Sequence, residues 1–257
     1  MKNRRRLAFL LAGCVALSIS SAVMTRTTSA IAGALAPVRV SDEVSALFDR
    51  RPQSAEVEVP RRGLDTMMLQ IEMPRSASEV TELAPAKTRK WWRQVLLWDL
   101  LFVAGYFLLF TGLAVNESGA ATLWERPTIC IVVTGITDMV ENLLLLEILN
   151  YLDAGLAIAG RRTLLALLII SALKWLLYFL SVRALSINLE KLDRWRVVAV
   201  VLRAAATGGS WTAILVLLGL PARPLLSLMT VITFAALGAA TMMRLLPPVR
   251  PREPISA

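Results

Sequence analysis

The chain contains no histidine and only two cysteines among its 257 residues. Without histidine it cannot form the zinc, haem or carboxylate–histidine di-iron sites that are usual in membrane enzymes, and histidine-based acid–base catalysis is excluded as well. Cys14 and Cys130 both lie inside apolar runs, so they cannot build a disulfide framework. Because no recognisable catalytic motif is present either, we expect no enzyme activity, no metal and no cofactor.

Charged residues are also scarce, at 18% of the chain, whereas hydrophobic residues make up 56% and the mean hydropathy is +0.61. The apolar residues gather into six runs of 18 to 23 residues. About 20 helical residues cross a hydrocarbon core about 30 Å thick. The sequence therefore predicts an all-α, polytopic membrane protein and excludes a soluble enzyme, a disulfide-rich secreted scaffold and a β-barrel porin. The six runs are Leu7–Met24, Val95–Val115, Thr128–Leu149, Thr163–Val182, Val197–Gly219 and Leu225–Met243.

The net charge of +9 does not indicate a nucleic-acid partner. Four basic residues lie at Lys2 and Arg4–Arg6, and residues 24–93 carry eleven basic and nine acidic groups. The remaining basic residues are spread over loops and helix ends, where they meet lipid headgroups. No dense basic face interleaved with aromatic residues is present. The lipid bilayer is the expected surrounding, and we expect no nucleic acid as a partner.

The first apolar run follows the basic segment Met1–Arg6, an arrangement typical of a secretory signal peptide. Ala30-Ile31-Ala32 offers a cleavage site, but an uncleaved signal anchor is equally compatible because 18 apolar residues can just span a membrane. Leu11-Ala12-Gly13-Cys14 resembles a lipobox, yet the apolar run continues through Val15–Met24, which favours unmodified mid-helix sequence. We therefore expect residues 1–24 to be a signal peptide or anchor, followed by a bundle of five spans.

Residues 25–93 form the one long stretch outside the apolar runs, and we expect this segment to be extracytoplasmic. Ser41–Arg51 has the pattern of a short amphipathic helix. Glu56–Val59 and Thr66–Met73 alternate polar and apolar residues around the turn signal Pro60–Gly63, which predicts a small β-hairpin. The segment has few aromatic residues, so we expect it to lean on the membrane domain.

Residues 94–246 then form the transmembrane helical bundle, and residues 247–257, rich in proline and basic residues, a disordered tail. The last two runs carry small residues four apart, which lets helices approach closely, although Gly208-Gly209 could instead be a hinge or a broken helix. The connection Leu220–Pro224 is short enough to require an antiparallel hairpin.

Tryptophans and basic residues bear on how the chain sits in the membrane. Trp91 and Trp92 beside basic residues predict an interfacial anchor. The basic start and the basic loop 183–196 favour cytoplasmic termini with residues 25–93 outside, although the basic cluster at 87–93 argues the other way. Trp124, Trp195 and Trp211 are further candidates for anchors.

Ionisable residues inside the predicted spans are the strongest functional signal. Asp99, Asp138, Glu141 and Lys174 each cost about 2.5–3.5 kcal/mol at a helix centre, so they should face the bundle interior and find partners. Asp138, Glu141 and Asn142 share one helix face by their spacing. Three carboxyl groups against one ammonium group leave an acidic surplus, so we expect at least one carboxyl group to hold or share a proton near neutral pH.

Two further polar stripes join this face. Lys174 shares a stripe with Ser171, Tyr178 and Ser181, and Asp99 shares a face with Phe102 and Tyr106. The candidate intramembrane polar cluster therefore comprises Asp99, Tyr106, Asp138, Glu141, Asn142, Lys174 and Tyr178.

Three short motifs carry a resemblance to other proteins. Asp-Leu-Leu-Phe-x3-Tyr at 99–106, Asp-Met-Val-Glu-Asn at 138–142 and Ala-Leu-Lys-Trp at 172–175 resemble motifs in a set of uncharacterised multi-span bacterial membrane proteins. The similarity covers about residues 95–185, and the Asp-x-x-Glu-Asn element is its most specific part. The resemblance implies a shared polar core and nothing about a substrate. We expect a multi-pass protein of the bacterial cytoplasmic (inner) membrane.

The polar cluster leaves several functions open. Polar groups in membrane helices often act as interhelical glue, worth about 0.6 kcal/mol for each hydrogen bond, which predicts an accessory or scaffold subunit with a protein partner in a membrane complex. The alternative is proton- or cation-coupled transport or proton handling, with Asp138 and Glu141 as carriers and Lys174 as their counter-charge. A lipid or small-ligand site and catalysis are further alternatives. No ATPase loop or inverted repeat is present, which weakens the transport hypothesis.

Overall fold

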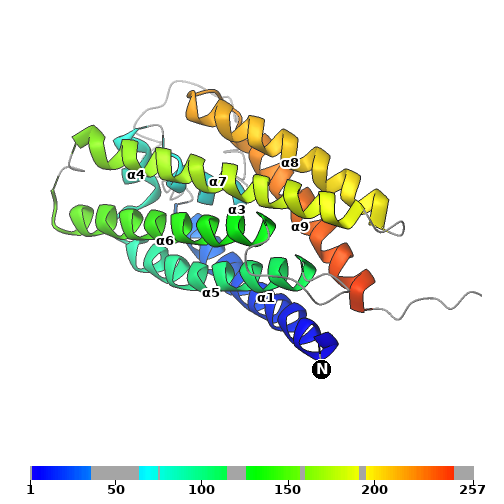
Figure 1. The fold of residues 1–257 in the computed structure, drawn as a ribbon. Coiled ribbons are helices and arrows are strands. Elements are labelled where there is room, and N and C mark those ends of the chain that lie inside the picture. The colour runs from blue at the N-terminus through cyan, green and yellow to red at the C-terminus, as the bar shows by residue number, and fades with distance from the viewer. Residues whose placement is uncertain are drawn as a thin grey trace, which may run out of the picture.

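The computed structural model describes residues 2–35, 64–74, 76–114, 126–156, 160–190 and 195–245. Within these ranges the chain forms eight α-helices and no strand (Figure 1). In chain order they are α1 (Lys2–Leu35), α3 (Leu64–Glu72), α4 (Ala77–Leu83), α5 (Arg89–Ala114), α6 (Arg126–Asp153), α7 (Gly160–Glu190), α8 (Arg196–Leu217) and α9 (Arg223–Leu245).

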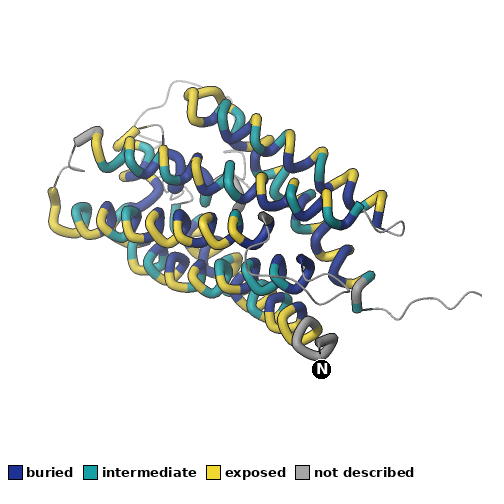
Figure 2. The backbone as a smooth tube through the Cα atoms, in the orientation of Figure 1, coloured by how far each residue is buried: buried dark blue, intermediate teal, exposed yellow. Residues whose placement is uncertain are grey.

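Six of these helices are long and apolar enough to cross a membrane, namely α1, α5, α6, α7, α8 and α9. This confirms the predicted class, a helical bundle of the multi-pass membrane type. The helices extend beyond the apolar runs, since α1 continues to Leu35 and α5 begins at Arg89. Exposed residues follow the outer faces of the helices (Figure 2). Apolar residues such as Leu97, Leu143 and Val197 are among the exposed ones, where lipid would cover them.

Each spanning helix packs against the next one along the chain, in the order α1, α5, α6, α7, α8 and α9. Consecutive spanning helices run antiparallel to each other, and α8 and α9 form the antiparallel hairpin that the sequence predicts. Residue 2 and residue 245 therefore lie at one end of the bundle, and α3 and α4 lie at the other end, which we call the α3/α4 end (Figure 1).

Glycines bring α1 and α5 into close backbone contact. A Cβ atom on Gly13 would lie 2.8 Å from the backbone nitrogen of Leu109, and one on Gly105 would lie 2.9 Å from the backbone nitrogen of Leu17. Neither position has room for a side chain, and small residues are what allow membrane helices to approach this closely. Helix α1 is thus packed into the bundle along its length.

Glycines in α8 serve packing as well. Helix α8 runs unbroken through Gly208-Gly209, so the alternative of a broken helix is wrong. A Cβ atom on Gly209 would lie 2.2 Å from the ring of Phe179, which fills that position from α7. Arg203 of α8 also pairs with Glu190 of α7.

The predicted strand Thr66–Met73 is wrong, because this segment lies in helix α3 and the residue after it. The apolar residues of α3 at 64, 67, 68 and 71 also fit the helical period, and a short segment of this kind satisfies both periods. A helix makes its own backbone hydrogen bonds, which suits a segment inserted between spanning helices. The other predicted elements of this region, Ser41–Arg51, Glu56–Val59 and the turn Pro60–Gly63, lie outside the described residues.

Two tryptophans predicted as interfacial anchors are core residues instead. Trp92 is 1% exposed and Trp195 is 0% exposed. The Trp92 indole donates a hydrogen bond of 2.8 Å to the backbone oxygen of Leu83, at the end of α4. Trp211 is exposed on the outer face of α8, whereas Trp124 lies outside the described residues.

Arg223, the first residue of α9, holds α3 and α4 against the bundle. Its guanidinium pairs with Glu79 of α4 at 2.6 Å and donates a hydrogen bond to the backbone oxygen of Met73, just after α3. Arg223 is buried and Glu79 is partly exposed, so the pair lies at the edge of the packed interior. The short segment that leads from α3 to α4 is therefore fixed at its position over the bundle end.

Candidate functional site

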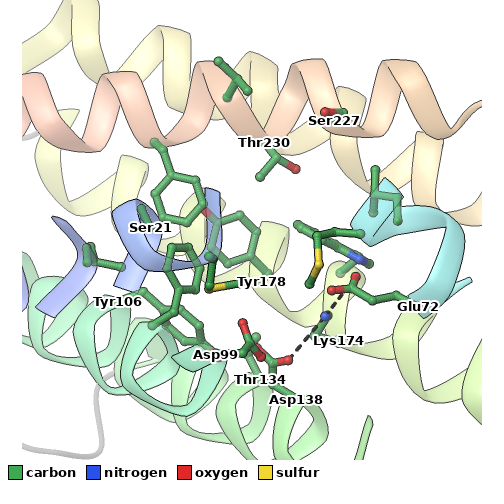
Figure 3. Close-up of a pocket in the computed structure, with 18 of the residues that line it drawn as sticks. Ser21, Glu72, Asp99, Tyr106, Thr134, Asp138, Lys174, Tyr178, Ser227 and Thr230 are labelled. Carbon is green, nitrogen blue, oxygen red and sulfur yellow. Dashed lines mark hydrogen bonds and ion pairs between the residues drawn. The ribbon is translucent and has the colours of Figure 1, made fainter. Parts of the chain in front are cut away.

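Lys174, in the middle of α7, is 6% exposed and lies among three carboxyl groups. Its Nζ atom is 3.2 Å from Oε2 of Glu72 and 3.3 Å from Oδ1 of Asp138, and it also pairs with Glu141 (Figure 3). The carboxyl groups come from α3 and α6, so the ammonium group links three elements. Burial of the Lys174 ammonium group is tolerated because it is paired, whereas the three carboxyl groups share this single counter-charge.

Hydrogen bonds join the same face of α6 to α5. Tyr106 of α5 donates a hydrogen bond of 3.1 Å to Oδ2 of Asp138, and Asn142 of α6 donates one of 2.8 Å to Oδ2 of Asp99. All four side chains are buried. Asp138, Glu141 and Asn142 thus share one helix face, and this face meets α5 on one side and Lys174 on the other.

Glu72 is held in place by Ser171 as well as by Lys174. The Ser171 hydroxyl donates a hydrogen bond of 2.7 Å to the backbone oxygen of Glu72 and also contacts the carboxyl group of Glu141. Burial raises the pKa of Glu72 above its usual range, and the Lys174 ammonium offsets part of that rise. Glu72 therefore sits in the cluster as a carboxyl group whose protonated form is favoured by its surroundings.

A cavity of about 570 Å³ opens beside the cluster, between α1, α3, α5, α6, α7 and α9 (Figure 3). Glu72, Asp99, Asp138 and Lys174 line it, so it has a charged wall. Glu141 is fully buried and does not line it. The remaining lining is aromatic, apolar and hydroxyl-bearing, from residues Leu17, Ser21, Met24, Thr25, Thr28, Met68, Leu69, Phe102, Tyr106, Thr134, Trp175, Tyr178, Ser227, Thr230, Val231, Phe234 and Ala235.

The structure brings the seven residues of the candidate cluster into one connected group, with Tyr178 joined through a ring contact of 6.4 Å to Tyr106. The sequence pattern does not predict Glu72 as a member of the cluster, because the alternation of polar and apolar residues over Thr66–Met73 predicts a strand outside the membrane bundle. A usable signal was present, since Glu72 lies between Ile71 and Met73 in a segment that also fits the helical period.

The group has the chemistry of a charge-binding site. In the described part of the chain it combines four carboxyl groups with one ammonium group, and three of those carboxyl groups face the cavity. No set of three or more histidine, cysteine, aspartate or glutamate residues within the described ranges is arranged to hold a metal ion. Comparison of the chain with protein-family models, with curated proteins and with solved structures gave no match.

Proposed function

We propose that the chain is a membrane protein that binds and moves protons or small cations through the Lys174 cluster. The observation that carries this proposal is the acidic surplus on a cavity wall. One ammonium group pairs with three carboxyl groups, and a fourth, Asp99, faces the same cavity. A polar cluster that only holds helices together requires paired polar groups, but it requires neither a surplus of one charge nor a cavity beside the cluster.

The geometry separates the roles of the two acids on α6. Asp138 lines the cavity, accepts a hydrogen bond from Tyr106 and pairs with Lys174. Glu141 is enclosed by Lys174 and Ser171, away from the cavity. We therefore assign Asp138 as the carrier that exchanges a proton or cation, and Glu141 as the partner that fixes the position of the Lys174 side chain.

Glu72 has a separate role in this proposal. It is the member of the cluster that comes from a short helix at the α3/α4 end rather than from a spanning helix. Its raised pKa favours proton uptake by its carboxyl group. We assign Glu72 as the group that exchanges protons between Asp138 and the α3/α4 end of the bundle.

The setting of the chain completes the proposal. We place it in a bacterial cytoplasmic membrane, with both termini in the cytoplasm and the α3/α4 end outside, because the N-terminus and the loop 183–196 are basic. Helix α1 then acts as a retained spanning helix rather than a cleaved signal, since its glycine packs on the α5 backbone. The lipid bilayer is the surrounding partner.

Flux measurements on the full chain test the proposal. The purified protein is reconstituted in liposomes that contain a pH-sensitive dye, and a membrane potential is imposed to drive cations inward. We expect a proton or cation flux above that of protein-free liposomes, which Asp138→Asn reduces to the protein-free level. Glu147→Gln is the matched control, because Glu147 is exposed on the same helix.

The scaffold hypothesis predicts a different result. If the cluster only fixes helix packing, wild type and Asp138→Asn both give the same flux as protein-free liposomes. The variant should then keep the packing of the wild type, because an amide can still accept the hydrogen bond from Tyr106. In that case the chain is an accessory subunit, and co-purification from mild detergent should reveal a protein partner.

A further inference from the structure

The cavity wall beside Asp99 and Asp138 consists of four aromatic rings in a closed circuit of contacts. Ring centroids lie 5.9 Å apart for Phe102 and Tyr106, 6.4 Å for Tyr106 and Tyr178, 5.7 Å for Tyr178 and Phe234, and 5.5 Å for Phe234 and Phe102. All four side chains line the cavity. They come from α5, α7 and α9, so three spanning helices converge on this wall.

Aromatic rings beside carboxyl groups form a site for substituted ammonium ions. The ring faces attract a cation that is weakly hydrated, and recognition of quaternary ammonium groups commonly uses several rings together. Asp99 and Asp138 supply the opposite charge at the same cavity. The hydrogen bond from Tyr106 to Asp138 joins the aromatic wall to the charged wall.

Tyr178 gives an independent indication of a ligand. The residue is 4% exposed and lines the cavity, yet its hydroxyl group has no hydrogen-bond partner among the described residues (Figure 3). Buried hydroxyl groups are normally paired, because an unpaired one loses its bonds to water without replacement. An N–H group of a protonated alkylamine bound in the cavity would provide the missing partner by donating to the hydroxyl oxygen.

The cavity continues toward the lipid-facing side of the bundle. A second hollow of about 340 Å³ lies between α1, α5 and α9 and shares Leu17, Ser21 and Phe234 with the first. Ser21 is exposed on the surface of α1. Residues of α1 and α9 line both hollows, so the two hollows lie along the line where these helices face each other. An apolar chain can lie along this line.

We propose that the cavity binds an amphiphilic organic cation, a substituted ammonium group on an apolar chain. The ammonium group lies among the four rings beside Asp99 and Asp138, and the apolar chain follows the hollow between α1 and α9. This inference rests on the proposed function, because it names the class of cation that the acidic surplus attracts. A zwitterionic phospholipid fits less well, because its phosphate group would lie beside unpaired carboxyl charge.

Binding to the full chain in nanodiscs of neutral lipid tests the ligand class. The probe is decyldimethylammonium, the protonated form of decyldimethylamine, measured by calorimetry against decyl glucoside, tetramethylammonium and decylphosphocholine. Decyl glucoside lacks the charge, tetramethylammonium lacks the apolar chain, and decylphosphocholine carries an added phosphate group. We expect the probe to bind at least about tenfold more tightly than each of them, the effect of a buried charge pair together with an apolar chain.

Variants test the position of each part of the ligand. Phe102→Leu should weaken probe binding by about 2- to 30-fold, whereas Phe107→Leu, on the same helix outside the cavity, should leave it unchanged.

Gly238→Leu fills the second hollow at a position where an added Cβ meets no atom within 4 Å. This variant should weaken binding of the probe but not of tetramethylammonium, and Gly33→Leu, equally unhindered and outside both hollows, is its control.

The results separate this inference from the proposed function. If Asp138→Asn abolishes flux but the probe binds no better than decyl glucoside, the ligand class is wrong and the proposed function stands. If the probe binds as expected and no flux is found, the ligand class stands and cation movement is wrong. Probe binding that is equal in wild type, Phe102→Leu and Asp138→Asn would reflect partition into lipid and would overturn the site.

Discussion

Asn142 of α6 donates a hydrogen bond of 2.8 Å to the carboxyl group of Asp99 on α5, and both residues are buried. The pair joins two spanning helices at the edge of the cavity, and the amide is the donor that the structure gives to Asp99. This relationship makes the stability of the α5–α6 contact depend on a polar pair, which substitutions can test.

We expect Asn142→Leu to destabilise the protein by about 1–3 kcal/mol, because it leaves a buried carboxyl group without its donor. The double variant Asn142→Leu with Asp99→Leu should lose less than the sum of the single changes, since no polar group is then left unpaired. Thermal unfolding in mild detergent provides the measurement. Strictly additive losses would show that the two side chains do not depend on each other.

Removal of Lys174 should expose the acidic surplus. Lys174→Ala leaves Glu72, Asp138 and Glu141 without their shared counter-charge, and removal of one partner of a buried ion pair costs about 3–5 kcal/mol. Protonation of the carboxyl groups can relieve this cost, so the loss should shrink as pH falls. Melting curves at two pH values measure it, and adding Glu141→Gln should recover stability beyond the sum of the single effects. A loss that is independent of pH would contradict the arrangement.

The burial of Glu72 predicts how the stability of the protein changes with pH. Burial raises its pKa above the ordinary value of 4.5, so its protonated form stabilises the fold at low pH, and this contribution is lost as pH rises through the raised pKa. The stability of wild type relative to Glu72→Gln should therefore fall as pH rises above 4.5. Unfolding of both proteins across this pH range is the measurement. A difference that grows with pH would mean that Lys174 outweighs burial at this position.

The glycine contact between α1 and α5 predicts that α1 stays in the mature protein. Intact mass of the purified chain should include α1 and show no lipid on Cys14, because lipobox processing would remove Gly13 and its contact with the Leu109 backbone. Gly13→Leu should lower the melting temperature markedly, whereas Gly33→Leu, where an added Cβ meets nothing within 4 Å, should not. A mass that matches a chain cleaved after Ala32, or a diacylglyceryl adduct on Cys14, would contradict this prediction.

Orientation can be tested by fusions. A C-terminal alkaline phosphatase fusion should be inactive, and protease added to intact spheroplasts should cut within residues 25–93, because this segment is assigned to the outside. An active C-terminal fusion would reverse the assignment.

The spans and most of the cluster could be predicted because both depend on local periodicity. Span length fixes the helices, and the spacing of Asp138, Glu141 and Asn142 fixes their shared face. Glu72 could not be placed in this way, since its contact with Lys174 joins segments about a hundred residues apart and its own segment fits two periods. The burial of Trp92 depends likewise on α4, whose carbonyl group binds its indole, and no local pattern in the chain encodes that partner.

The contact of Arg223 with Glu79 and Met73 bears on the order of assembly. Arg223 is the first residue of the last spanning helix, so α3 and α4 gain this anchor only after nearly the whole chain has been synthesised. Until then, Glu72 can already pair with Lys174 of α7, but α3 and α4 lack their contact with Arg223. Helix α9 also supplies one wall of the cavity, so a nascent chain arrested before residue 223 would carry all four acids beside a cavity that is open on its α9 side.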